Sequence, residues 1–157
     1  MMLEARSRGV FSFSSDLIGG DGEELGWYRS GLFGGGSMLV GQFPYRVFRT
    51  GFGRWTVEQE GVPGAVAEAT RTRVFRTAYE ITWDGGSVTV ERSGFGFRME
   101  LVRDGQVVGS ASPRHIFSKS WIGEFPDDMP LVAAAFVLWL VERLRRSSGA
   151  AAGGGGG

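Results

Sequence analysis

The 157-residue chain contains no cysteine and a single histidine, His115. The absence of cysteine excludes disulfide bonds, thiolate metal sites and cysteine nucleophiles, and it suits a reducing compartment. Residues 1–8 carry charges with no apolar core behind them, so we expect no secretory signal. Together these observations predict a cytoplasmic protein.

Net charge is also absent, because 17 basic residues balance 17 acidic ones. A balanced chain has no overall field that draws it to nucleic acid, so we expect no nucleic-acid partner. All basic residues except Lys119 are arginine. Arginine favours paired hydrogen bonds to carboxylate or phosphate, so a local arginine cluster would still attract an anion.

No catalytic or metal-binding pattern stands out from the sequence. His115 lies between Arg114 and Ile116 and has no adjacent acid or base to act with. We therefore predict no catalytic residue, no metal, no cofactor and no enzyme activity. The other polar candidates lack a partner base or the ligand spacing of a calcium loop, and they are Ser12, Ser14, Ser15, Asp21, Glu23 and Glu24.

Glycine is abundant, with 27 residues that separate short segments rich in Val, Phe, Trp, Tyr and Thr. This pattern is typical of many strands joined by tight turns. Such regular spacing predicts a mostly-β fold, a closed antiparallel barrel or roll of about twelve strands. The predicted strands cover residues 3–7, 10–14, 25–30, 37–42, 45–49, 55–59, 66–71, 79–83, 87–92, 98–102, 107–112 and 116–121.

Two of the turns carry hairpin signals. Asp-Gly-Gly at residues 84–86 and Asp-Gly at residues 104–105 each lie between alternating segments. After the first turn, alternation places Val88 and Val90 on one face of the strand.

An internal repeat connects two parts of the chain. Residues 49–55 (RTGFGRW) reappear as residues 92–98 (RSGFGFR), and each copy precedes a strand, a glycine turn and a small-residue strand. The copies are too few for a solenoid and fit a barrel built from two related halves. Neither Gly-Phe-Gly turn precedes a helix, which a phosphate-binding loop normally does. We therefore predict that Phe52 and Phe95 pack down onto the core.

One strong helix pattern covers residues 129–146. Asp127 and Asp128 suit its N-cap, and Pro130 suits its first turn. Residues 131–141 are apolar on all sides, so this helix must be buried in a protein core or in a membrane. Arginines follow at the C-terminal end of the helix, which is the negative end of its dipole.

The length of the apolar segment favours burial in the core. A membrane span needs about 20 apolar residues, and the charges flanking this shorter segment would cost roughly 2.5–3.5 kcal/mol each in hydrocarbon. We therefore expect a core helix and no transmembrane span. Residues 1–147 form one predicted domain, and the alanine- and glycine-rich tail at 148–157 is predicted to be disordered.

The arginines give the one functional lead. If several converge on one face, they would hold an anionic headgroup. Cross-strand pairing with the glutamates at positions 58, 60, 68, 80, 91 and 100 is the simpler interpretation for those on strands. These arginines are Arg46, Arg49, Arg54, Arg71, Arg73, Arg76, Arg92, Arg98 and Arg103, with Arg143, Arg145 and Arg146 following at the helix end.

Three features together resemble the tubby C-terminal-like superfamily, which includes tubby proteins, phospholipid scramblases and LURP-one-related proteins. They are the duplicated strand–Gly-Phe-Gly–strand unit, the strand ending in VVGS at 107–110, and the sequence FPDDMPL at 125–131 followed by FVLWL at 136–140 and a basic close. The similarity covers residues 10–146 and is strongest to small bacterial members. It implies a closed antiparallel barrel around a hydrophobic C-terminal helix.

The function that the resemblance implies is a binding or scaffold role without catalysis. The phosphoinositide-binding residues of tubby proteins have no matching positions here, and the cysteine-rich and acidic segments of scramblases are missing. We predict peripheral contact with anionic phospholipid or a protein partner, with Arg143, Arg145 and Arg146 as the lipid contacts. Two alternatives stay open: a tail-anchored scramblase-like membrane protein, and a carrier of a small apolar ligand inside the barrel.

Overall fold

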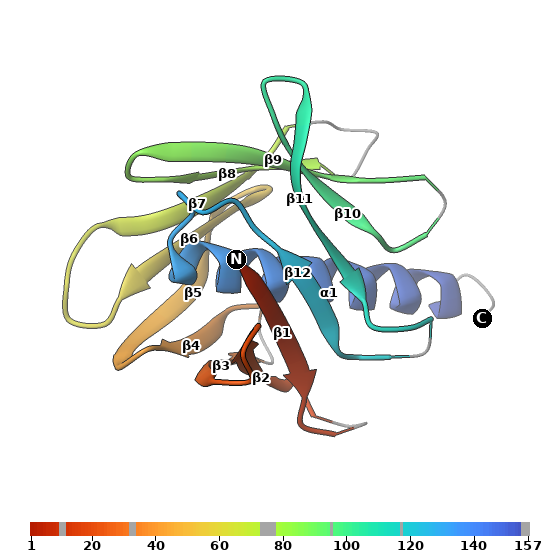
Figure 1. Cartoon of the computed structure of the whole chain (residues 1–157), viewed down its shortest axis with the longest axis horizontal. Helices are drawn as coiled ribbons and strands as arrows, with labels where there is room; N and C mark the ends of the chain where they lie inside the picture. Colours follow the sequence, from red (N-terminus) through yellow and green to blue (C-terminus); the bar gives the residue numbers. More distant parts are fainter. Residues whose placement is uncertain (10–11, 32–33, 73–77, 95, 117, 155–157) are drawn as a thin grey trace.

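A computed structural model describes residues 1–9, 12–31, 34–72, 78–94, 96–116 and 118–154. Twelve antiparallel strands form a closed barrel around one helix, which confirms the predicted fold class (Figure 1). Each strand pairs with its neighbours in sequence, and β1 closes the barrel against β12. The elements are β1 (Met2–Ser7), β2 (Ser14–Gly19), β3 (Glu24–Ser30), β4 (Gly36–Val40), β5 (Phe43–Gly51), β6 (Arg54–Gln59), β7 (Ala65–Arg71), β8 (Ala78–Trp83), β9 (Gly86–Arg92), β10 (Met99–Arg103), β11 (Gln106–Pro113), β12 (Trp121–Glu124) and α1 (Leu131–Gly154).

Two of the predicted strands are wrong, and the others agree with the structure to within a few residues. The second strand was predicted at 10–14, where residues 10 and 11 lie outside the described part, but β2 begins at Ser14. The last was predicted at 116–121, but β12 begins at Trp121. Both strands have a polar or small residue on the inner face, which interrupts the apolar alternation that predicts a strand. In β2 this residue is Ser15, which is buried, and in β12 it is Gly123.

The predicted hairpins are confirmed. Asp104 and Gly105 both have positive φ, 52° and 76°, and they join β10 to β11 in the conformation that Asp-Gly favours. Val88 and Val90 lie on the inner face of β9, with 2% and 1% of their surfaces exposed.

The two copies of the repeat form the β5–β6 and β9–β10 connections, and each leads through a hairpin into the next strand. The prediction that Phe52 packs down is wrong, because 94% of its surface is exposed. A two-residue turn at the end of a hairpin carries Phe52 beyond the last contact with the wall. Phe95, in the second copy, lies outside the described residues.

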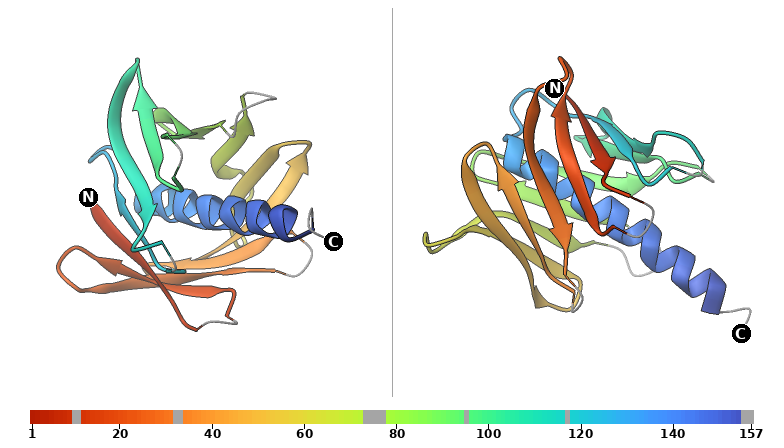
Figure 2. Two further views of the ribbon diagram at one scale, coloured as in Figure 1. Left: turned by 90° about the vertical axis from the view of Figure 1, so that its right-hand side faces the viewer. Right: turned by 90° about the horizontal axis from the view of Figure 1, so that it is seen from below.

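The helix fills the barrel, as predicted. The side chains from Ala133 to Leu140 are all fully buried, including Phe136 and Trp139. Figure 2 shows that α1 runs lengthwise through the barrel and leaves it at the end opposite to the one where it enters. No helix in the described part of the chain is long and apolar enough to cross a membrane.

Both ends of α1 differ from the prediction. The helix begins at Leu131, so the predicted N-cap is wrong, and Pro130 takes that place through its carbonyl, which accepts the Ala134 N–H at 3.0 Å. Asp127 and Asp128 instead pair with the N-terminal amine and with Arg103, at 3.4 and 3.0 Å.

At its other end α1 continues to Gly154, so it passes Arg146 and extends into the tail predicted to be disordered. Residues 155–157 lie outside the described part. A helix that is already formed propagates cheaply, and alanine is the best helix former, so composition alone did not reveal this extension.

Close contact between α1 and the wall depends on a glycine in β4. A Cβ atom at Gly36 would lie 2.5 Å from the Trp139 Nε1 and 2.5 Å from the Arg29 carbonyl oxygen. Only a residue without a side chain lets the Trp139 indole approach this strand so closely.

We expect Gly36→Ala to lower the free energy of unfolding by roughly 1–3 kcal/mol, because overpacking displaces Trp139 or the strand. Gly51→Ala is the matched control, since a Cβ there meets nothing nearer than 4.0 Å and its change should stay within about 0.5 kcal/mol. Urea unfolding measures both, and equal stability of the two variants would contradict this packing.

Candidate functional site

The two ends of the barrel carry opposite charge. Turns after odd-numbered strands lie at the end where α1 leaves, and turns after even-numbered strands lie where it enters (Figures 1 and 2). The described turns at the exit end contain no Asp or Glu, and the described turns at the entry end contain no Lys or Arg. The exit-end turns carry Arg8, Arg98, Arg114 and Lys119, and the entry-end turns carry Asp21, Glu23, Glu60, Asp84, Asp104, Asp127 and Asp128.

Three exposed strand arginines lie at the inner rim of the exit end. Arg49, Arg71 and Arg92 occupy the last inward-facing positions of β5, β7 and β9. Residues directly opposite on neighbouring strands share a face, and the partners of these arginines are buried against the core. Those partners are Trp55, Tyr79 and Met99, respectively.

The helix brings three more arginines to the same place. α1 leaves the barrel here (Figure 2). Its arginines contact residues at this end: Arg143 lies over Trp55, Arg145 donates to Ser118 and Arg146 donates to Ser30. We call the combined set the basic mouth: Arg49, Arg71, Arg92, Arg143, Arg145 and Arg146.

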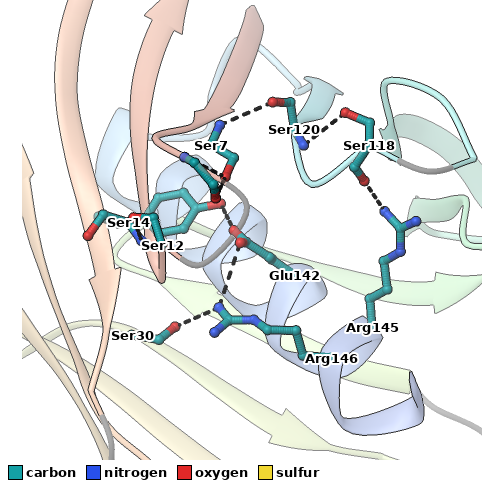
Figure 3. Close-up of polar contacts among 11 residues, drawn as sticks. Ser7, Ser12, Ser14, Ser30, Ser118, Ser120, Glu142, Arg145 and Arg146 are labelled. Atoms are coloured by element: carbon teal, nitrogen blue, oxygen red, sulfur yellow. Dashed lines mark hydrogen bonds and ion pairs between the residues drawn. The ribbon is translucent and has the colours of Figure 1, made fainter. Parts of the chain in front are cut away.

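Arg145 and Arg146 fasten the helix to the wall (Figure 3). Arg145 donates hydrogen bonds to the carbonyl oxygens of Ser118 and Ile116, at 2.5 and 2.7 Å. Arg146 donates to the Ser30 hydroxyl at 2.9 Å and lies 3.6 Å from the Glu142 carboxylate. Burial lowers the pKa of Arg145, and the Glu142 charge partly offsets this effect.

Arg143 is held differently, by aromatic rings. Its guanidinium carbon lies 4.6 Å from the ring centre of Trp55 and 5.6 Å from that of Trp139. Burial lowers the pKa of Arg143, and the positive charges of Arg146 and Arg49 lower it further.

A buried acid lies beneath the mouth. Glu142 is 6% exposed, and its carboxylate accepts a hydrogen bond from the hydroxyl of Tyr28, which is fully buried. Burial raises the pKa of Glu142, while the Tyr28 hydrogen bond and the Arg146 charge act in the opposite direction. A pocket of about 340 Å³ opens beside Glu142, between α1 and the β11–β12 connection, and Lys119 and Trp121 also line it.

Apolar side chains project from the turns around the mouth. Phe13, Phe52, Phe97 and Ile116 are 50%, 94%, 40% and 73% exposed. Guanidinium groups of the mouth lie within 6.0 Å of the centres of three of these rings: Arg146 near Phe13, Arg49 near Phe52 and Arg145 near Phe97. The entry end also exposes apolar side chains, but among carboxylates, and these are Met2, Phe43, Val62 and Val107.

The other residues considered in the sequence, His115 and Asp21, take part in local hydrogen bonds of turns. His115 is exposed in the β11–β12 connection, where its carbonyl accepts the Ser118 N–H at 2.9 Å. Asp21 accepts the Glu23 N–H at 3.0 Å within a turn. Within the described residues, no three His, Asp or Glu side chains gather closely enough to hold a metal ion.

The sequence contains a signal for the inward arginines. Each lies two residues after a buried apolar residue of its strand: Val47, Ala69 and Val90. Period-two alternation therefore places them on the inner face. Of the predicted cross-strand pairs with glutamate, the structure contains Arg46–Glu58 at 3.2 Å. Arg73 and Arg76 lie outside the described residues.

No family model and no curated protein matches this chain. Its fold is similar to that of a crystal structure of a protein from Arabidopsis thaliana, with a TM-score of 0.59 and 14% sequence identity. The match covers 94% of this chain and 91% of the plant protein. At this identity the likeness concerns the whole fold and carries no function.

We expect Glu142 to give the protein a distinct dependence of stability on pH. Because burial raises its pKa above the usual 4.5, the stability contributed by the protonated carboxyl is present below that pH and is lost as pH rises through the folded-state pKa. Glu142→Gln is neutral throughout. Urea unfolding across this range should show wild type losing stability relative to Glu142→Gln as pH rises, and a pH-independent difference would contradict this expectation.

Proposed function

We propose that this chain is a non-enzymatic binding domain of tubby-like fold whose basic mouth docks onto an anionic lipid surface. The observation that carries the proposal is that the arginines of the basic mouth and several exposed aromatic side chains lie at the same end of the barrel. The superfamily membership inferred from the sequence is part of the proposal, and the plant structure supports its fold alone.

The two features act on different parts of a lipid surface. Each arginine near an anionic leaflet contributes about 1 kcal/mol of attraction, over a range set by the Debye length. Phenylalanines at the rim bury apolar surface at the boundary of headgroups and acyl chains. The carboxylates at the opposite end are repelled, so the charge distribution also orients the molecule.

The other candidate functions need a different arrangement of the helix. A carrier of an apolar ligand needs an empty barrel, and α1 occupies that space. A tail-anchored protein needs α1 to leave the barrel, which would remove Phe136 and Trp139 from their buried positions. Docking through the basic mouth needs neither change.

Vesicles that contain phosphatidylglycerol should bind the protein at low salt and release it at high salt, because ionic screening weakens the attraction. Phe52→Ser should weaken binding by about tenfold, as expected for losing one buried aromatic contact. Phe43→Ser removes an exposed phenylalanine from the acidic end and is the matched control. Flotation with the vesicles measures all three proteins.

Absence of binding at low salt would contradict the proposal. So would equal losses for the two phenylalanine variants. Binding of an acidic protein under conditions where vesicles do not bind would assign the basic mouth to a protein partner instead.

A further inference from the structure

Arg49 and Arg143 approach the same indole ring from different elements. The guanidinium carbon of Arg49, on β5, lies 5.7 Å from the centre of the Trp55 ring, and that of Arg143, on α1, lies 4.6 Å from it. Trp55 is itself fixed by an edge-to-face contact with Trp139, at 5.3 Å between ring centres. Two cations are thus positioned by one rigid aromatic pair.

Neither cation has a counterion in the described part of the chain. The ion pairs of this part involve other arginines, and no hydrogen bond from Arg49 or Arg143 is present among the described residues. The direction of the Arg143 pKa shift agrees with this absence of a counterion. This pKa is lowered by burial, by Arg146 and by Arg49, and the one group that raises it is the Tyr79 phenol.

The backbone next to Arg143 carries no side chain. Gly34 lies next to Arg143, and a Cβ atom there would come within 3.4 Å of the Arg143 Nη2 and 3.8 Å of the Trp55 ring. Gly34 has a φ of 100°, a conformation that disfavours any larger residue. Arg49 itself is exposed, so an anion can reach the pair from solvent.

We infer that Arg49 and Arg143 form a binding site for a phosphate monoester above the Trp55 ring. Two unpaired guanidinium groups call for more than one negative charge, and a phosphate monoester carries about −1.5 to −2 at neutral pH, against −1 for a carboxylate. Guanidinium also offers paired donors that match phosphate oxygens. The phosphate belongs to a lipid headgroup or to a soluble ester, and the first source rests on the proposed function.

Inorganic phosphate tests the site in solution. In two-dimensional NMR spectra at constant ionic strength, phosphate should shift the indole N–H signals of Trp55 and Trp139 in a saturable way, because both rings contact Arg143. Arg49→Gln should weaken this binding by about tenfold or more, as expected for losing a charged hydrogen-bond donor. Arg98→Gln, which removes an exposed cation from the same end of the barrel, should leave it unchanged.

Arg143→Gln should abolish the phosphate-dependent shift. If Arg143→Gln does not fold, Arg49→Gln still tests the site, because Arg49 is an exposed strand residue. The absence of a saturable shift in the wild type would overturn the inference. Equal binding by Arg49→Gln and Arg98→Gln would overturn it as well.

Vesicles distinguish the source of the phosphate. Phosphatidate carries a phosphate monoester, whereas phosphatidylglycerol carries only a diester, so the two are compared at equal surface charge. A preference for phosphatidate that Arg49→Gln loses and Arg98→Gln keeps supports a headgroup. Phosphate-dependent indole shifts without that preference assign the site to a soluble ester. Shifts that persist when neither vesicle binds overturn the membrane proposal and leave the phosphate site intact.

Discussion

Burial of α1 inside the barrel is the constraint on which the rest of the structure depends. The apolar segment from Leu131 to Val141 has nowhere else to bury its surface, and twelve short strands supply a closed wall around it. This arrangement requires small residues where the helix meets the wall, as at Gly36. It also fixes the direction of α1, which must enter next to β12 and leave at the other end.

The direction of the helix determines where the charges meet. Residues after Val141 emerge among the ends of odd-numbered strands, so arginines from α1 join the inward arginines of β5, β7 and β9. Arg145 and Arg146 donate hydrogen bonds that hold the helix to the wall. Arg143 instead lies over the Trp55 ring, so its N–H donors are available to a ligand. The basic mouth therefore combines structural arginines with a pair suited to binding an anion.

Much of this fold could be predicted from the sequence, because alternation, Asp-Gly turns and an all-apolar helix are local signals. The errors fell where inner-face positions are polar or small, as at Ser15 and Gly123, since these residues hide the alternation of a strand. Phe52 was placed wrongly because a phenylalanine alone does not reveal on which side of a turn it lies. The segregation of charge could not be predicted, since it depends on which turns share an end, and only the closed topology decides that.

The most direct test of the account places one fluorophore at each end of the barrel. The chain has no cysteine, so Phe52→Cys and Phe43→Cys each give a single attachment site for an environment-sensitive dye. On adding anionic vesicles, the dye at position 52 should shift its emission to shorter wavelength as it enters the lipid interface, and the dye at position 43 should remain in water. The account would be contradicted if position 43 entered the lipid, or if both positions responded equally.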